Sequence, residues 1–518
     1  MAPVRVADVP DSGLVQDDAH DPVRAAAARR PDAPALIAGE TTLTWQDLSA
    51  RVDEAARRLW ALCPQAGARV ALVLGNTLDF AVTFHGVLRA GLVAVPLNPG
   101  YTDDELTYAL TDAGAAVVVA EQAVRDRLRP GQAVVVPPEL PAADGPGAAP
   151  ATPRADQVAV LLYTSGTSGR PKGAMLSHAA LAANHDQLDR IDPPVVGPDD
   201  VVLLAVPLFH AYGLNTGLGT VAHHGACGVL VDKFDPAGSL ATIARHGVTV
   251  TLGVPSMYAA WSRRPEAAQV LAGLRAAVCG AAPLDPDDAT RFEAVSGVRI
   301  IVGYGLTETA PVLTTTAVGT RHKTGSIGRP LPGVSLLLRT ADGAVLWRDG
   351  TASLDEDLAE LDLAIADSDG TDPGEIVVRG PNLFSGYWPD GQGGPDADGW
   401  WGTGDVAYAD GEGDLVLVDR IGELILVNGF NVYPAEIERV LAEHPGVAEA
   451  AVIGAPDAET GQAPHAFVVP AADPPPTPEE LREHCSRWLA RFKLPKVIDL
   501  VAELPHSPIG KVRKSALS

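Results

Sequence analysis

The sequence predicts an α/β fold. We expect a large layered N-terminal domain, with parallel sheets flanked by helices, and a small mobile α+β C-terminal domain. Short apolar runs alternate with helix-like segments along the first part of the chain, which is typical of parallel strands joined by helices. At 518 residues the chain exceeds what one hydrophobic core usually supports. The last hundred or so residues have a helix–strand pattern of their own.

The N-terminal elements follow from caps and periodicity. Thr44 and Asp47 predict a helix start, and Thr102 and Glu105 predict another, because each pair can form a capping box. A further helix is expected over 80–90. Buried strands are expected at 70–74, 92–95, 116–120 and 159–163. The first helix should bury its apolar stripe, which consists of Leu48, Val52, Ala56 and Leu59.

The C-terminal unit is predicted in the same way. A helix should begin at Pro434, and a second should follow the Thr477 cap with Glu480 three residues later. Strands are expected at 450–453 and 466–469. We therefore expect a core domain over 1–419, a hinge at 420–422 and a rotating domain over 423–518.

Composition excludes several classes of protein. The net charge of −26 disfavours nucleic acid as a partner, because an acidic surface repels phosphate backbones. The N-terminus lacks the apolar core of a signal peptide, and no apolar run is long enough to span a bilayer. The four cysteines are scattered and fit neither a disulfide framework nor a zinc site. We expect a reduced, cytoplasmic protein without integral membrane association.

The stretch YTSGTSGRPKGAMLSH, residues 163–178, concentrates hydroxyls and glycines before Lys172. Glycine N–H groups can wrap an anion, hydroxyls can donate hydrogen bonds, and a lysine adds a point charge. The spacing differs from that of the common phosphate loop. The composition is equally compatible with a flexible loop between a strand and a helix.

Other segments favour a nucleotide site. GYGLTETAP, residues 303–311, offers Tyr304 for stacking on a base and Glu308 for Mg²⁺, although Glu308 alone is more typical of a solvated surface carboxylate. GWWGTGD ends in Asp405, which can accept hydrogen bonds from ribose. Arg420 opens DRIGELILVNGFNVYPAEIE, and Lys511 follows Gly510 near the C-terminus.

Together these segments, with LFHAYGLN at 208–215 and PHAFVV near 466, resemble the adenylate-forming superfamily of acyl-CoA synthetases, adenylation domains and firefly-type luciferases. The resemblance covers nearly the whole chain and favours the fatty-acyl or aryl (4-coumarate) CoA ligase branch. It implies that a carboxylate attacks ATP to give acyl-AMP and pyrophosphate, and that a thiol then displaces AMP. The implied cofactors are ATP, Mg²⁺ and coenzyme A.

The resemblance implies a role for each matching residue. Glu308 binds Mg²⁺, Lys511 contacts the carboxylate and α-phosphate during adenylation, and Thr164 and Lys172 belong to a mobile loop over the phosphates. The implied nucleotide contacts are Thr164, Ser165, Gly166, Thr167, Ser168, Gly169, Lys172, Gly280, Ala281, Ala282, Gly303, Tyr304, Gly305, Thr307, Asp405, Arg420 and Lys511.

The same resemblance implies the acyl and thiol sites. His210 matches the residue where the acyl and thiol channels meet, although a lone histidine is more often structural. The CoA channel would comprise His210, Gly429 and Phe430. The acyl pocket would comprise His210, Ala211, Gly213, Ala281, Gly303, Ala310 and Val312. These small apolar residues indicate an apolar acyl or aryl group. Malonate-type ligases place an arginine where this chain has Gly303.

Two departures and several alternatives remain. Gly422 replaces the usual lysine or aspartate of the hinge, and residues 344–372 exceed the family's short turn. Leu354, Leu358, Leu361 and Ile365 recur there at helical spacing, which favours an amphipathic surface insertion. A carrier protein could replace coenzyme A as the thiol, a homodimer is left open, and a nucleotide-binding regulator without turnover is the remaining alternative.

Overall fold

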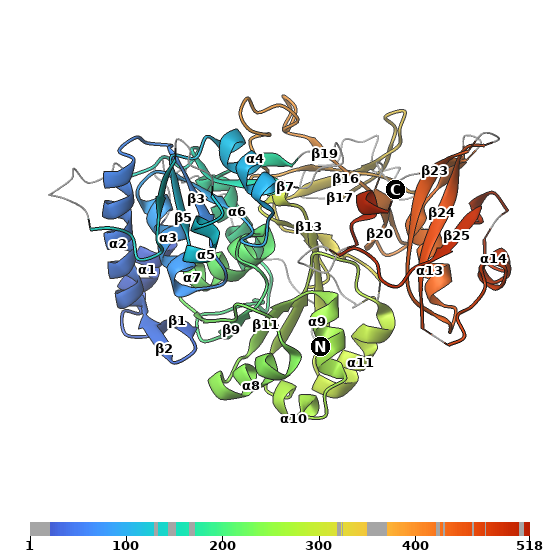
Figure 1. The fold of residues 1–518 in the computed structure, drawn as a ribbon, viewed down its shortest axis with the longest axis horizontal. Coiled ribbons are helices and arrows are strands. Elements are labelled where there is room, and N and C mark those ends of the chain that lie inside the picture. Colours follow the sequence, from blue (N-terminus) through green and yellow to red (C-terminus); the bar gives the residue numbers. More distant parts are fainter. Residues whose placement is uncertain are drawn as a thin grey trace. The chain divides into compact units, whose positions relative to one another are not determined.

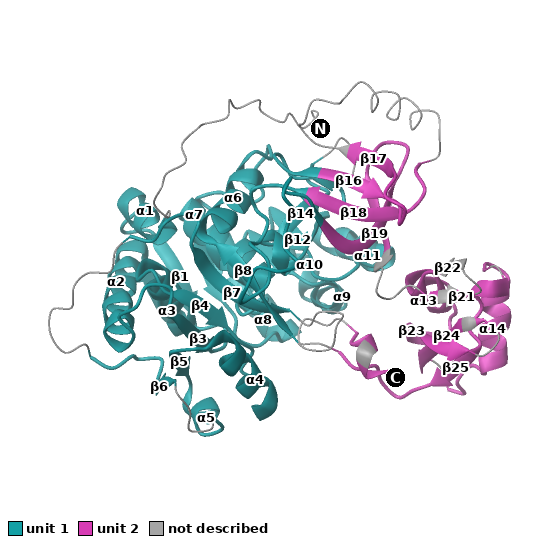
Figure 2. Ribbon diagram, turned by 90° about the horizontal axis from the view of Figure 1, so that it is seen from above, with its two compact units in different colours: residues 1–335, 379–401 teal, residues 336–378, 402–518 magenta. Residues whose placement is uncertain are grey.

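The structure, a computed structural model, divides into two compact units (Figure 2). Unit 1 comprises residues 1–335 and 379–401, and unit 2 comprises residues 336–378 and 402–518. Among the described residues, no helix has the length and apolar composition that crossing a membrane requires. The described residues are 21–128, 133–142, 152–164, 171–318, 323, 325–349, 370–420, 425–427, 430–457, 460–471, 473–489, 491–506 and 512–517.

The first sheet of unit 1 contains the predicted N-terminal strands, each shifted by one residue at most at either end. Its order is β6-β5-β3-β4-β7-β8, and all its neighbours are parallel except β7 and β8. The strands are β3 (Arg69–Val73), β4 (Val93–Pro96), β5 (Val117–Ala120), β6 (Val134–Val136), β7 (Val158–Thr164) and β8 (Lys172–Ser177).

The second sheet of unit 1 has the order β15-β14-β13-β12-β11-β9-β10-β1-β2. Its central strands are parallel, and antiparallel pairs close both edges. The strands are β1 (Pro34–Ala38), β2 (Thr41–Thr44), β9 (Val201–Leu204), β10 (Cys227–Leu230), β11 (Val250–Gly253), β12 (Ala276–Cys279), β13 (Ile300–Gly305), β14 (Val312–Thr315) and β15 (Arg329–Pro330).

Helices cover these sheets (Figure 1). Both predicted capping boxes are present, at Thr44 with Asp47 and at Thr102 with Glu105. The helices are α1 (Pro22–Arg29), α2 (Trp45–Leu62), α3 (Leu78–Arg89), α4 (Asp103–Ala113), α5 (Gln122–Arg125), α6 (His178–Asp189), α7 (Thr220–His224), α8 (Pro236–His246), α9 (Pro255–Ser262), α10 (Ala267–Leu271) and α11 (Pro286–Ser296), with the π-helix η1 (Tyr212–Gly219) and the 3-10 turn η2 (Thr307–Thr309).

Strand alternation sends neighbouring residues of unit 1 into different cores. On β3, Val70 and Leu72 join the core shared with α2 and α3, while Ala71 and Val73 join the core under α4. The nine-stranded sheet also contributes to the shared core, and its other face packs against α8, α9 and α11. Both sheets are therefore buried on two faces, as parallel sheets generally are.

The glycine-rich stretch lies between two strands, not between a strand and a helix. β7 and β8 pair antiparallel, and Thr164 stands directly opposite Lys172. Helix α6 begins only at His178, after the Ser177 cap. The alternative of a loop between a strand and a helix was therefore wrong, because the apolar residues after Lys172 form a strand of the sheet.

Unit 2 contains two sheets and two α-helices among its described residues. The first sheet has the order β17-β16-β18-β19-β20, and the second has β22-β21-β24-β23 with β25 beside β24. The elements are β16 (Ser335–Arg339), β17 (Val345–Asp349), β18 (Gly374–Arg379), β19 (Trp401–Ala409), β20 (Leu415–Arg420), β21 (Ile425–Val427), β22 (Phe430–Val432), α13 (Pro434–Ala442), β23 (Val447–Asp457), β24 (Gly461–Pro470), α14 (Pro478–Ser486), η4 (Arg491–Lys493), β25 (Val497–Leu500) and η5 (Lys514–Ala516).

The predicted C-terminal elements are present. Helix α13 starts at Pro434, and Thr477 forms a capping box with Glu480 at α14. The boundary expected at 420–422 does not coincide with the division into units, because unit 2 also includes 336–378 and 402–419. That boundary concerns a rotation and stays a prediction. Within 344–372, residues 345–349 form β17, whereas the helix-like leucines lie outside the described residues.

Candidate active site

The predicted site residues differ in how far the structure describes them. Ser165, Gly166, Thr167, Ser168 and Gly169 lie outside the described residues. The same holds for Gly422, Gly429 and Lys511, and only the backbone is described at Arg420 and Phe430. All the other predicted site residues are described, and most of them belong to unit 1.

Glu308 is buried, with 7% of its surface exposed, and lies in the 3-10 turn η2. The Tyr387 hydroxyl donates a hydrogen bond to Glu308 Oε1 across 2.7 Å. The Phe384 N–H donates to the Glu308 carbonyl oxygen. The solvated-surface interpretation of Glu308 was therefore wrong, since this carboxylate is held at both its side chain and its backbone.

Lys172 lies close to the same tyrosine. Its Nζ is 5.3 Å from the centroid of the Tyr387 ring, within the range of a cation–π contact. Lys172 is exposed and opens β8, opposite Thr164 at the end of β7. The structure thus brings together the lysine at one end of the glycine-rich stretch and the carboxylate of the predicted metal site.

Buried amides hold the backbone that follows Glu308. Asn382 Nδ2 donates to the Thr309 carbonyl oxygen across 2.7 Å, and Asn215 Nδ2 donates to the Ala310 carbonyl oxygen across 2.7 Å. Asn184 bonds both the N–H and the carbonyl oxygen of Val312. The sequence interpretation missed these amides and Tyr387, because nothing in their local pattern distinguishes them from ordinary polar or aromatic residues.

Several of the predicted nucleotide contacts lie at the ends of two neighbouring strands of the nine-stranded sheet. β12 ends at Cys279, directly before Gly280, and the parallel strand β13 ends with Gly303, Tyr304 and Gly305. Ligands of open parallel sheets bind at such carboxyl ends. Ala281 has φ of +70°, and Ala310 has φ of +62°. Left-handed alanines are strained, and such strain tends to cluster at functional sites.

The glycines of this region differ in their surroundings. A Cβ added at Gly303 would meet no atom of the described part of the chain within 4 Å. A Cβ at Gly305 would overlap the Pro311 carbonyl oxygen, and one at Gly213 would overlap the Pro207 carbonyl oxygen. Gly305 and Gly213 therefore lack a side chain because the backbone packs against them. Gly303 borders open space, as expected for a pocket-lining position.

The remaining acyl-pocket candidates are apolar and mostly buried. Ala211, Ala310 and Val312 are 6%, 0% and 9% exposed. Ala211 directly precedes the π-helix η1, and Ala310 and Val312 follow η2. Extended π-helical turns are rare and are frequent at functional sites. Ala310 and Val312 therefore lie on the backbone segment that the buried amides fix.

His210 has a buried ring nitrogen in need of a partner. Its Nε2 has no hydrogen-bond partner among the described residues, although the atom is buried. Burial lowers the pKa of His210 to about 4, so the ring is neutral at physiological pH. A buried polar atom without a partner is costly and can indicate a ligand site. This favours the functional interpretation of His210 over the structural one.

In unit 2, Asp405 and Arg420 are direct partners in the antiparallel register of β19 and β20. Asp405 is 3% exposed, and its N–H donates to Thr403 Oγ1 across 3.1 Å. Two of the three predicted nucleotide contacts of this unit are therefore neighbours across one pair of strands, while the third, Lys511, lies outside the described residues.

The donor set fits Mg²⁺ bound together with a nucleotide. No described group of three or more histidine, cysteine, aspartate or glutamate side chains could hold a metal ion. Mg²⁺ commonly binds through one or two carboxylates and substrate phosphate oxygens. Glu308 supplies one hard oxygen ligand, which suits an ion that arrives with a polyphosphate.

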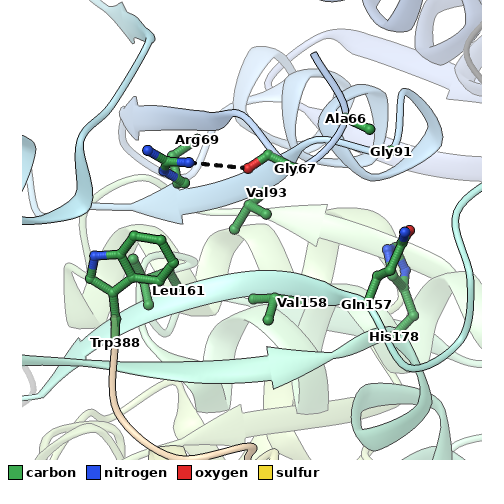
Figure 3. Close-up of a pocket in the computed structure, with 10 residues that line it drawn as sticks. All are labelled: Ala66, Gly67, Arg69, Gly91, Val93, Gln157, Val158, Leu161, His178 and Trp388. Carbon is green, nitrogen blue, oxygen red and sulfur yellow. Dashed lines mark hydrogen bonds between the residues drawn. The ribbon is translucent and has the colours of Figure 1, made fainter. Parts of the chain in front are cut away.

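A pocket of about 260 Å³ lies elsewhere in unit 1 (Figure 3). Its wall includes the first residues of β3, β4 and β7, so it lies at the opposite end of β7 from Thr164. Arg69 packs over the Trp388 ring there, with Cζ 5.1 Å from the centroid. None of the predicted site residues lines it. The lining residues are Ala66, Gly67, Arg69, Gly91, Val93, Gln157, Val158, Leu161, His178 and Trp388.

Two family models match this chain, and together they span most of it. The AMP-binding enzyme family matches residues 23–388, and the AMP-binding enzyme C-terminal domain matches residues 436–511. A long-chain-fatty-acid–CoA ligase of Yersinia pestis is 34% identical, over 95% of this chain and 92% of its own. A feruloyl-CoA synthase of Amycolatopsis sp is 36% identical, over 95% and 96%.

Solved structures agree with these matches. ATP-bound MatB from Rhodopseudomonas palustris has a TM-score of 0.83 at 31% identity, covering 96% of this chain and 98% of its own. The o-succinylbenzoate CoA synthetase MenE from Bacillus subtilis, in complex with its acyl-adenylate intermediate, has a TM-score of 0.80 at 28% identity, with the same coverage.

Proposed function

The chain belongs to the family of AMP-binding enzymes, and from that premise we propose that it activates an apolar fatty or aryl carboxylic acid. It is an ATP-dependent acid–CoA ligase that works through acyl-AMP. Its cofactors are ATP, Mg²⁺ and coenzyme A. The assignment of its residues and of its acid substrate is our proposal.

The residues of unit 1 would act mainly by positioning charge, as is usual in phosphoryl chemistry. Lys172 and the loop that it ends would hold the β- and γ-phosphates. Glu308 would hold Mg²⁺, which neutralises phosphate charge when it is bound. The substrate carboxylate would attack the α-phosphorus, and the P–O bond to pyrophosphate would break. The thiol of coenzyme A would then attack the acyl carbon and release AMP.

The open space beside Gly303 supports an apolar acid most directly. A Cβ there would meet no atom of the described residues within 4 Å, and the other pocket candidates Ala211 and Ala310 are uncharged. Position 303 itself offers no cation to a second carboxylate, and an unpaired carboxylate is costly to bury. Fatty and aryl acids need no such partner. The matches to a fatty-acid ligase and a feruloyl-CoA synthase agree with this choice.

The test is a panel of fatty, aryl and dicarboxylic acids in a pyrophosphate-release assay, with free coenzyme A as the sole thiol. We expect turnover with apolar acids and much weaker turnover with dicarboxylic acids. Gly303→Arg adds a cation at this position and should reduce use of apolar acids, while improving relative use of dicarboxylic acids. Gly303→Ala is the matched control and should keep the wild-type order of preference.

Preference of the wild type for a dicarboxylic acid would overturn the substrate assignment. Adenylation of an apolar acid without AMP release on addition of coenzyme A would favour a carrier protein as the thiol partner. A cytoplasmic location, a homodimer and rotation of the C-terminal domain stay predictions.

A further inference from the structure

We propose that Tyr387 is a positioning residue for ATP activation, which keeps Lys172 and Glu308 apart and correctly placed. The inference rests on the proposed roles of Lys172 at the phosphates and of Glu308 at Mg²⁺. It is independent of which acid the enzyme uses.

Tyr387 is placed by a segment that extends the sheet beside β8. Within the segment, Ser385 N–H donates to the Met175 carbonyl oxygen across 2.9 Å, and Trp388 N–H donates to that of Gly173 across 2.8 Å. Gly386 has φ of +98°, and a Cβ there would overlap the Gly391 backbone. The turn therefore requires glycine, and the backbone that presents Tyr387 is fixed on both sides.

Two parts of the tyrosine contact the two charged residues. The hydroxyl donates to Glu308 Oε1 across 2.7 Å, and the ring centroid lies 5.3 Å from Lys172 Nζ. The Phe384 N–H fixes the Glu308 backbone across 2.8 Å. One short segment thus controls the position of the carboxylate and the position of the ammonium group.

Neutral contacts matter here because opposite charges at short range would otherwise attract each other. Among the described residues, Lys172 and Glu308 form no ion pair with each other, although both contact Tyr387. The hydroxyl orients the carboxylate without neutralising it, so Glu308 Oε2 stays available to a metal. The ring face attracts the ammonium group and leaves its N–H donors available to phosphate.

Two substitutions separate the hydroxyl from the ring. Tyr387→Phe removes only the hydrogen bond, and we expect it to raise the Mg²⁺ concentration for half-maximal ATP–pyrophosphate exchange about tenfold, since a hydrogen bond to a charged group is worth roughly that much. The KM for ATP at saturating Mg²⁺ should change little. Tyr387→Leu also removes the ring, and it should additionally raise that KM roughly two- to fivefold.

Tyr163→Phe is the matched control. The Tyr163 hydroxyl, on β7, donates to Asp112 of helix α4 across 2.6 Å, so this variant loses a similar bond to a carboxylate. It should keep the wild-type Mg²⁺ titration. Binding of Mn²⁺ in the presence of α,β-methylene ATP, followed by electron paramagnetic resonance, provides a readout without turnover. We expect the Mn²⁺ affinity to fall in Tyr387→Phe and to stay at the wild-type value in Tyr163→Phe.

A double-mutant cycle with Glu308→Gln decides whether Tyr387 acts through Glu308. We expect Tyr387→Phe to add little to the loss already caused by Glu308→Gln, because both remove the same placed carboxylate. Additive losses, or an unchanged Mn²⁺ affinity in Tyr387→Phe, would overturn the proposal. If Tyr387→Phe lowers thermal stability and Mn²⁺ affinity stays at the wild-type value, the tyrosine is structural and the proposal also fails. Failure of the substrate assignment alone leaves these metal titrations unaffected.

Discussion

Single side chains of this active site depend on partners that are distant in sequence. Glu308 would be costly to bury alone, and it is stabilised by Tyr387 from 79 residues away. His210 shows the opposite case, because its Nε2 is buried without a described partner and its pKa falls to about 4. His210 should therefore remain neutral throughout the pH range in which acyl-CoA ligation is measured.

Lys511 is predicted to act in acyl-AMP formation and not in thioester formation. Lys511→Ala should reduce acyl-AMP formation by orders of magnitude, because a cation would no longer stabilise the developing phosphate charge. It should largely spare conversion of supplied acyl-AMP to acyl-CoA. Rapid-quench measurement of the two half-reactions checks this prediction, and equal losses in both would contradict it.

At the scale of secondary-structure elements, the packing of the π-helix η1 explains why position 213 is a glycine. The family resemblance implied that Gly213 lines the acyl pocket, but a Cβ at this position would overlap the carbonyl oxygens of Pro207 and Val206. The missing side chain is therefore explained by close packing of the start of η1 on the preceding loop. The same comparison leaves Gly303 as the glycine that borders free space.

Gly213→Ala should consequently destabilise the protein by about 1–3 kcal/mol, as expected for overpacking a tight site. Gly303→Ala serves as the control and should change the free energy of unfolding much less, because its Cβ meets no atom within 4 Å. Urea unfolding of both variants measures the difference. Equal stability of the two variants would refute the packing explanation.

At the scale of the whole molecule, function requires two half-reactions from one chain. Within unit 2, β20 ends the first sheet at Arg420 and β21 starts the second at Ile425. Gly422 belongs to the segment between these sheets. This position suits the proposed hinge, because a rotation between two separately hydrogen-bonded sheets need not break either one.

Gly422→Pro tests the hinge, since proline restricts φ and removes an N–H. We expect acyl-AMP formation near the wild-type rate and a collapse of acyl-CoA formation. Gly422→Lys, the control, should be mild, because lysine is common at the matching position of the family. The ratio of the two half-reaction rates is the measurement. An unchanged ratio in Gly422→Pro would place the hinge elsewhere.

The sequence by itself determined the features that depend on neighbouring residues. Capping boxes join residues three apart, so Thr44, Thr102 and Thr477 marked their helix starts correctly. Apolar runs likewise located the buried strands, and the ordered motifs identified the chemistry. Such signals are readable because their physical cause lies within a few residues of the pattern itself.

Only the tertiary structure decided which distant residues share a site. It paired β7 with β8 on either side of the glycine-rich stretch, and it brought Tyr387 into contact with both Lys172 and Glu308. It also separated the packing role of Gly213 from the open position of Gly303. These outcomes depend on contacts between segments that are far apart along the chain, so they cannot be predicted from local sequence preferences.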